Sequence, residues 1–559
     1  MLYKHLITVS VLSTCLVAVF SENTVVTLPN GKIQGREAKS FINTTFYAFQ
    51  EVPYAAPPVG DLRFKAPAPV KNWEGVLETL KNTKICIQGG TDARQNEDCL
   101  YLNVYTPVVP GTEANLPVLV FIHGGGFVGG SGIYDGLGPE FFMDTGRIVV
   151  VTINYRLGPF GFLSTEDDVI PGNNGLKDQR FALLWVQENI HLFGGDPKKV
   201  TIDGQSAGSA SVSYLVFSKQ SEGLFRAAIH ESGTVLISWG YQRYARDIAY
   251  KAAAAIDNTF TKSNTSVELL ELLQKVSARD LQDVANKLQC VAKEVPTKHI
   301  NPGYIFAPVV ESGEDGFLTE LPYEGIEKGH INKVKMIIGM NSEESITQVS
   351  NLESFKNLMT SYDNDLTIIV NDDFHVTDED VELTIGQEIR KIYVKDLFQD
   401  DLASSVRFIS DCRYTHNIIR YAQLASQFAD VYFYQFSYDG ELGGVNAYIE
   451  GAESVAHSEE LQYLWRNNRN QDVTKFPEGD VLTHKRLVQM WTNFVTDLDP
   501  TFEEDELLQN VTWPLVEYDN FRYLDIRDDL NVKTDPKKDT YKSWENIYAK
   551  YAIKPLDTL

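Results

Sequence analysis

Residues 200–208 are VTIDGQSAG, a short apolar segment followed by a serine between two glycines. The first four residues have the β-branched, apolar character of a buried strand, and residues 204–208 fit the pattern G-x-S-x-G. Small residues around the serine let a strained turn pass close to the sheet, where the strand gives way to a helix. The pattern predicts that Ser206 stands at the carboxyl edge of a sheet and acts as a nucleophile. A serine in an ordinary loop is the alternative, so the prediction needs support from other segments.

Apolar segments of strand length recur along the chain, with helix-like segments between them. Residues 176–190 have apolar side chains at helical spacing, which predicts a helix. Strands that alternate with helices favour a mostly parallel central sheet covered by helices. Because no linker or internal repeat interrupts the chain, we expect an α/β protein with a single domain over residues 22–559 and long insertions. The predicted strands are residues 24–28, 46–49, 100–105, 116–122, 148–154, 200–203, 227–231, 335–338 and 431–436.

Three successive glycines follow the predicted strand at residues 116–122. The segment is His123-Gly124-Gly125-Gly126-Phe127. With no side chains in the way, backbone N–H groups can point into one cavity, as an oxyanion hole requires. A merely flexible loop is the alternative, but the serine turn elsewhere in the chain favours the oxyanion hole.

A nucleophilic serine also needs an acid and a base, which in this class of fold follow it in the order Asp or Glu, then His. Glu343 and Glu344 both lie in a turn after the predicted strand at residues 335–338, and position alone does not choose between them. His457 is the favoured base, because it lies in a loop of small residues after the predicted strand at residues 431–436. The other candidates are His375, which lies among acids and is expected to face solvent, and His416 and His484, which lie in helix-like segments.

Residues 1–21 are predicted to be a signal peptide. Lys4 precedes an apolar run at residues 6–20, and the small residues around Ser21 suit cleavage after it. A transmembrane anchor is the alternative, but the run is short and interrupted by hydroxyl side chains. The C-terminus has neither an apolar tail nor an ER-retention signal. We therefore expect a soluble, secreted, extracellular protein.

The chain is strongly acidic. It has 50 Lys and Arg residues against 76 Asp and Glu residues, a net charge of −26. Removal of residues 1–21 takes away Lys4 and no acid, so the net charge becomes −27. Such a chain should repel nucleic acids and anionic membranes, and its acidic surface aids solubility. We expect a small-molecule substrate, no nucleic-acid partner and no stable membrane anchor, while the oligomeric state stays open.

If the protein is secreted, its cysteines can form disulfides and three of its asparagines can be glycosylated. Cys86 and Cys99 lie 13 residues apart in a polar, loop-like stretch, so we expect a disulfide between them. Whether Cys290 and Cys412 also form a bond stays open. The sequence N-x-S/T marks candidate glycosylation sites at Asn43, Asn264 and Asn510.

Taken together, these motifs resemble the type-B carboxylesterase/lipase family of the α/β-hydrolase fold. The resemblance covers residues 25–548, nearly the whole mature chain. Its landmarks are FQEVPYAAPPVGDLRF at residues 49–64, EDCLYLNV at 97–104, the glycines after His123, NYR at 154–156 and DQ at 178–179. Two positions depart from the family pattern, with Glu51 and Ser454 each standing where the family has glycine. With its signal peptide and Gln205 before the serine, the chain is most similar to insect secreted carboxylesterases.

The resemblance implies a role for each motif. Ser206 matches the nucleophile, and His457 matches the base in the family's H-x-x-E-L run. Glu344 rather than Glu343 matches the acid, because the family acid immediately precedes a small residue, here Ser345. The oxyanion-hole donors are matched by Gly125, Gly126 and Ala207, and the family's first disulfide by Cys86 and Cys99. No metal and no cofactor are implied.

The function expected from the resemblance is that of a serine esterase. A Ser-His-Glu triad would hydrolyse neutral, apolar carboxylic esters through an acyl-enzyme intermediate. A juvenile hormone esterase is the main alternative within this class. A catalytically silent interaction protein is less favoured because the triad is present, and a cholinesterase because no tryptophan lies in residues 91–96. The natural ester is not predicted.

Overall fold

The computed structural model describes residues 24–290, 299–301, 303–313 and 315–559. The predicted signal peptide lies outside these residues, as does the side chain of Cys290. Residues 22 and 23 of the expected domain also lie outside them.

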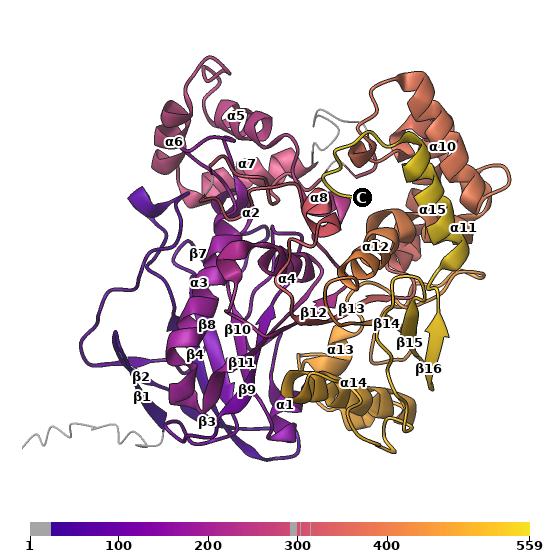
Figure 1. The fold of residues 1–559 in the computed structure, drawn as a ribbon. Coiled ribbons are helices and arrows are strands. Elements are labelled where there is room, and N and C mark those ends of the chain that lie inside the picture. Colours follow the sequence, from indigo (N-terminus) through magenta and orange to yellow (C-terminus); the bar gives the residue numbers. More distant parts are fainter. Residues whose placement is uncertain (1–23, 291–298, 302, 314) are drawn as a thin grey trace, which may run out of the picture.

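An eleven-stranded sheet forms the centre of the protein (Figure 1). Its strand order is β16-β15-β14-β13-β12-β11-β9-β10-β8-β4-β3. The seven strands from β15 to β10 run parallel to their neighbours, and antiparallel strands extend the sheet at both edges. The strands are β3 (Arg36–Lys39), β4 (Thr45–Pro53), β8 (Tyr101–Thr106), β9 (Leu116–Ile122), β10 (Val149–Ile153), β11 (Gly195–Gln205), β12 (Ala227–Glu231), β13 (Lys335–Asn341), β14 (Val431–Phe436), β15 (Arg522–Ile526) and β16 (Leu530–Thr534).

The expected elements are confirmed over most of the chain. β9, β12 and β14 coincide with the predicted strands, while β11 and β13 extend beyond them. β11 is longer because residues 195–199 continue the strand outside its apolar segment, and all of them except Gly195 are partly or fully exposed. Two small sheets lie apart from the central one: β1 (Val25–Leu28), β2 (Gly31–Gln34) and β5 (Val76–Glu78), and β6 (Ile85–Cys86) with β7 (Gln95–Asn96).

The two faces of the central sheet bury separate apolar cores. Along β9, Val118 and Val120 belong to one core, while Leu119 and Phe121 belong to the other, because successive strand side chains point to opposite faces. The second core is covered by α1 (Glu140–Thr145), α13 (Leu461–Leu464) and α14 (Glu478–Asp497), which contribute Phe141, Leu464 and Trp491. In Figure 1, α14 lies along the lower edge of the molecule. We refer to this side of the sheet as the α14 face.

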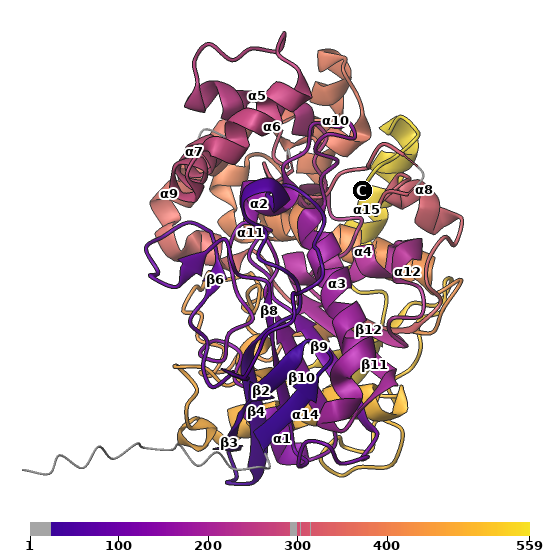
Figure 2. The ribbon, with the colours of Figure 1, turned by 90° about the vertical axis from the view of Figure 1, so that its left-hand side faces the viewer.

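The remaining helices bury their apolar side chains in the first core. Helix α3 covers the predicted helix, but it starts two residues earlier and its last turn is a 3₁₀ helix at Ile190–Phe193. Figure 2 shows α5, α6 and α7 together above the strands. The helices of this face are α2 (Gly158–Phe162), α3 (Asn174–Asn189), α4 (Ala207–Phe217), α5 (Ala245–Ile256), α6 (Ser266–Lys275), α7 (Ala278–Cys290), α8 (Pro322–Glu327), α9 (Leu352–Asn364), α10 (Glu379–Tyr393), α11 (Leu402–Ser410), α12 (His416–Ala425) and α15 (Lys538–Tyr551).

The parallel strands carry the candidate residues to one edge of the sheet. β9 ends before the glycine loop, β11 before Ser206, and β13 three residues before Glu344. β14 leads into the loop that holds His457. Because neighbouring parallel strands end at the same edge, segments far apart in the sequence meet there.

Candidate active site

Ser206 occupies the sharp turn between β11 and α4. Its backbone has φ 59° and ψ −124°, a strained conformation for a residue other than glycine. The turn is held because the Ser206 N–H donates to the Glu231 carbonyl at 2.8 Å and the Ser206 carbonyl accepts from the Ala210 N–H at 2.9 Å. A Cβ atom at Gly208 would lie 2.0 Å from the Ile122 carbonyl oxygen, so only glycine fits this close approach to the sheet.

Glu344 and His457 meet beside this turn. Glu344 Oε2 lies 2.7 Å from His457 Nδ1, and the carboxylate is fully buried. Its other oxygen, Oε1, accepts from the Asn341 N–H at 2.8 Å and from the Ser232 hydroxyl at 2.6 Å. These bonds fix the carboxylate, so its second oxygen is held toward the imidazole. Of the two glutamates, Glu344 contacts His457, whereas the carboxyl of Glu343 lies buried without a hydrogen bond of normal geometry among the described residues.

Burial and nearby negative charges shift the pKa of His457 in opposite directions. Desolvation lowers the pKa of its imidazole, but the hydrogen bond to Glu344 and the negative charges of Glu344 and Glu460 together raise the pKa above the usual 6.5. The His457 N–H of the backbone also donates to the Glu344 carbonyl at 3.1 Å. Glu344 and His457 are therefore hydrogen-bonded through both their side chains and their main chains.

The second ring nitrogen of His457 faces the serine turn. Its Nε2 atom lies 3.2 Å from Gln205 Nε2, whose amide can donate to a neutral imidazole. Within the part of the chain that is described, no hydrogen bond joins Ser206 Oγ to His457. Contacts between nucleophile and base are often loose without substrate and tighten when it binds.

The glycine loop lies against Ser206. A Cβ atom at Gly124 would stand 2.9 Å from Ser206 Cβ, so the loop and the serine turn are in close contact. Gly125 and Gly126 have φ angles of 107° and 61°, which favour glycine. Ala207 is the first residue of α4, where free N–H groups and the helix dipole favour negative charge.

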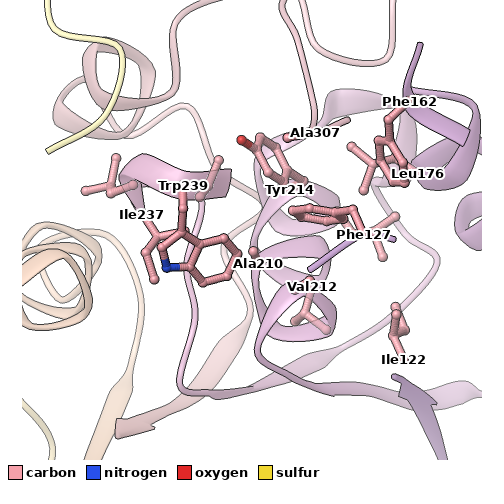
Figure 3. Packing of buried hydrophobic residues seen from close by; sticks show 14 of the residues in the cluster. Ile122, Phe127, Phe162, Leu176, Ala210, Val212, Tyr214, Ile237, Trp239 and Ala307 are labelled. Atoms are coloured by element: carbon pink, nitrogen blue, oxygen red, sulfur yellow. The ribbon is translucent and has the colours of Figure 1, made fainter. Parts of the chain in front are cut away.

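Four aromatic residues gather beside the loop and the imidazole. Phe127 and Trp239 lie side by side over α4, with ring centroids 6.4 Å apart (Figure 3). The Trp239 ring also lies 5.2 Å from Tyr304 and 5.8 Å from Tyr414, and Tyr414 lies 4.6 Å from the His457 ring. We call these four residues the aromatic wall. Tyr304 and Tyr414 cannot be identified from the sequence, because nothing in their local sequence marks a contact made through the tertiary fold.

The structure separates His457 from the other histidine candidates. His416 in α12 lies 3.0 Å from Glu545, and His484 in α14 lies 2.7 Å from the Tyr463 carbonyl. The expectation that His375 faces solvent is wrong in part. Its side chain is only one-third exposed and lies 3.6 Å from Asp557, because the C-terminal segment packs over it.

The remaining predicted positions have varied settings. Cys86 and Cys99 form a disulfide, and Cys412 is buried with no disulfide partner among the residues whose side chains are described, which do not include Cys290. Asn43 and Asn510 are exposed, whereas Asn264 is half-buried. Arg156 forms a two-point ion pair with buried Asp178, with distances of 2.6 and 2.7 Å, so this cation is engaged within the protein.

Comparisons with known proteins place the chain in a family. A model of the carboxylesterase family matches residues 22–544. This chain belongs to the carboxylesterase family. Juvenile hormone esterase of Tribolium castaneum is 32% identical to this carboxylesterase. The match covers 90% of this chain and 87% of the Tribolium protein. Esterase FE4 of Myzus persicae is 33% identical over 88% of both chains.

A solved structure supports the same fold for this carboxylesterase. Juvenile hormone esterase from Manduca sexta, with OTFP covalently attached, superposes with a TM-score of 0.82 and 30% identity. The match covers 94% of this chain and 99% of the other. The predicted α/β-hydrolase fold, with its large and mostly parallel sheet, is thereby confirmed. Among its described residues, this carboxylesterase has no helix long and apolar enough to span a membrane.

Proposed function

We propose that this carboxylesterase hydrolyses neutral, apolar carboxylic esters through a Ser206-His457-Glu344 triad. The observation that carries the proposal is the 2.7 Å contact between Glu344 Oε2 and His457 Nδ1, at the sheet edge where Ser206 occupies its strained turn. Glu344 holds the imidazole as the tautomer protonated on Nδ1, so the Nε2 lone pair can accept the Ser206 proton once the serine hydroxyl replaces the Gln205 amide as its partner. The serine oxygen then attacks the ester carbonyl.

The developing oxyanion requires N–H donors on the far side of the carbonyl. We assign this role to the backbone N–H groups of Gly125, Gly126 and Ala207, which the contact between Gly124 and Ser206 supports. His457 returns its proton to the leaving alcohol, and an acyl group remains on Ser206. Water then attacks the acyl-enzyme with His457 again acting as base, which releases the acid.

The dependence of the rate on pH tests the role of His457. Because the imidazole must be neutral to accept a proton, kcat/KM should rise with pH through one ionisation of the free enzyme. Glu344 raises the pKa of His457, so the midpoint should lie above 6.5. The measurement is kcat/KM for a neutral ester across pH 5 to 9. A flat profile, or a midpoint well below 6.5, would contradict the assignment.

The choice of neutral esters rests on the aromatic wall. Tyr304 is exposed, and Trp239, Tyr414 and Phe127 continue the aromatic contacts behind it, so the surroundings of the proposed catalytic residues are largely apolar. Each buried methylene of the substrate contributes about 0.8 kcal/mol, so longer acyl chains should bind better until the space is filled. A fixed charge without a partner would lose hydration at a cost of several kcal/mol.

A pair of matched substrates tests this preference. We expect an uncharged butyryl ester to be hydrolysed with a higher kcat/KM than butyrylthiocholine under the same conditions. The acyl groups are identical, so the comparison isolates the charge on the leaving group. A higher kcat/KM for the choline ester would contradict the proposed substrate class.

A juvenile hormone esterase activity is the second candidate. Two observations favour it: the likeness to the Tribolium castaneum relative, and that to the Manduca sexta structure. A terpenoid methyl ester with a higher kcat/KM than simple butyryl esters would support this narrower substrate.

We further propose that the mature protein is secreted as one domain over residues 22–559 after loss of residues 1–21. The apolar run at residues 6–20 and the Cys86–Cys99 disulfide support an oxidising, extracellular location. Asn43, Asn264 and Asn510 are the proposed glycosylation sites.

A further inference from the structure

Three carboxylic acids are buried on the α14 face, directly behind the proposed triad. Asp203 and Glu231 lie on neighbouring strands, where Asp203 pairs with Ile229 and Gln205 with Glu231. Side chains two residues apart share a face, so Asp203 and Glu231 project with Ile229 into the apolar core under α14. Glu460 enters from the segment before α13, and all three residues are fully buried.

The neighbours of these acids are mostly aromatic. Glu231 Oε1 accepts from Trp491 Nε1 of α14 at 2.7 Å. Across the sheet, Glu231 pairs with Gly339, which pairs in turn with Tyr434. A Cβ atom at Gly339 would lie 2.0 Å from the Tyr434 ring, so this ring covers the glycine beside Glu231. The Tyr434 and Trp491 rings lie 5.4 Å apart and enclose the acids.

Hydrogen-bond donors are scarce in this enclosure. The unpartnered acceptors are both oxygens of Asp203 and one oxygen each of Glu231, Glu460 and Asn341. Five acceptor oxygens therefore lack a donor. Among the described residues that surround them, the Tyr434 hydroxyl is the one donor that also lacks a partner. No salt bridge joins any of the three acids to a lysine or arginine in the described part of the chain. Ionised carboxylates supply no donors, whereas each protonated carboxyl supplies one.

The group is connected to the proposed triad through Asn341. The Asn341 side-chain amide donates to Glu460 Oε2, and its backbone N–H donates to Glu344 Oε1. Full ionisation would place three negative charges beside Glu344, in surroundings where an unpaired charge is strongly destabilised.

We propose that Asp203, Glu231 and Glu460 form a buried proton-sharing cluster that retains at least two protons at neutral pH and so limits the negative charge behind Glu344 and His457. Protons on two or more of the acids supply the missing donors and are exchanged among the facing oxygens. The three acids act as positioning residues, because they adjust the charge felt by the triad without touching substrate. This last effect rests on the roles proposed above for Glu344 and His457.

The groups that face the cluster agree with this picture. They are Tyr434 from β14, Glu344 from the turn after β13, His457 from the loop after β14, and Trp491 from α14. Burial and then the charge of Glu344 raise the pKa of Glu460 to about 7, against the opposing effects of the Asn341 hydrogen bond and of His457. Burial is also the main cause that raises the pKa values of Asp203 and Glu231 well above their usual range, although the Gly204 N–H acts in the opposite direction at Asp203.

Stability as a function of pH tests the cluster independently of activity. A group whose pKa is raised by folding holds its proton when folded and loses it when unfolded, so stability falls as pH rises between the two pKa values. Asp203→Asn replaces the protonated acid by a neutral side chain of the same shape. Relative to the parent, its Tm should rise by about 1 °C per pH unit between pH 5 and 8, given one proton and the unfolding entropy of a chain this long.

Two further variants complete the test. Glu231→Gln, which keeps the oxygen that Trp491 contacts, should show the same trend and serves if Asp203→Asn does not fold. Glu37→Gln, at an exposed position on the edge strand β3, is the control and should show none. The proposal would be overturned if, for both cluster variants, the difference in Tm from the parent did not change with pH or became more negative as pH rises. Either result would indicate ionised acids held by ordered water.

The acid limb of kcat/KM gives the second readout. If Asp203 is already protonated, Asp203→Asn should leave the midpoint of this limb where the parent has it. A midpoint displaced to lower pH would show that the parent carries a negative charge there, which contradicts the proposal. Because the Tm measurement needs no substrate, it stands even if the proposed triad is wrong.

Discussion

Ser206→Ala should lower kcat for a neutral ester by at least about 10⁴-fold while leaving the fold intact. The loss is this large because the acyl-enzyme cannot form, and only binding and oxyanion stabilisation remain. The fold should survive because Ala removes one oxygen atom from a turn whose backbone hydrogen bonds, to Glu231 and from Ala210, do not involve the side chain. Steady-state kinetics with one neutral ester makes the measurement.

A serine in the adjacent helix α4 supplies the control. Ser211 in α4 accepts a hydrogen bond from Gln179 at 3.0 Å and is buried away from the proposed triad. Ser211→Ala should therefore lose one buried hydrogen bond and keep its activity. Turnover by Ser206→Ala within tenfold of the parent, in protein free of parent enzyme, would exclude Ser206 as the nucleophile.

Glu344→Gln should lower kcat by about 10³- to 10⁴-fold at neutral pH. The amide can still accept from Ser232 and Asn341 through its oxygen, so its NH₂ group is left facing His457 Nδ1. That contact favours the tautomer protonated on Nε2, which cannot take the serine proton. The amide also removes the charge that stabilises the imidazolium.

Glu343→Gln is the matched control at the neighbouring position. Glu343 is equally buried, but burial raises its pKa to about 7, so a neutral amide stays close to its protonated form. The loss of kcat should be far smaller than for Glu344→Gln. Equal losses, or a larger loss for Glu343→Gln, would reject Glu344 as the acid.

Much of the fold could be predicted from the pattern of apolar residues. β9 is a continuous apolar run, and β12 and β14 are mostly apolar, because all three are buried on both faces, and such segments are recognisable without a structure. The limits of β11 and β13 were harder, because pairing with neighbours extends a strand past its apolar segment. The antiparallel edge strand β16 was missed, because its residues are mostly polar and exposed.

Some residues of the candidate site could be predicted from the sequence, and others could not. Ser206, the glycine loop and the two glutamates stand out because each directly follows a recognisable strand. Ser232 and Asn341 do not, although their hydrogen bonds orient Glu344, because only the parallel register of β12 and β13 brings them to it. The contact between Tyr414 and His457 depends on a π-helical turn between α11 and α12, which no local sequence signal marks.

Labelling with an organophosphate tests the central claim most directly. Such a reagent phosphorylates an activated serine, and peptide mass spectrometry then identifies the residue that carries the label. The proposed triad predicts one label per chain, on Ser206, with loss of esterase activity in proportion to labelling and no label in Ser206→Ala. Activity that survives full labelling, or a label on another residue that accounts for the loss, would contradict it.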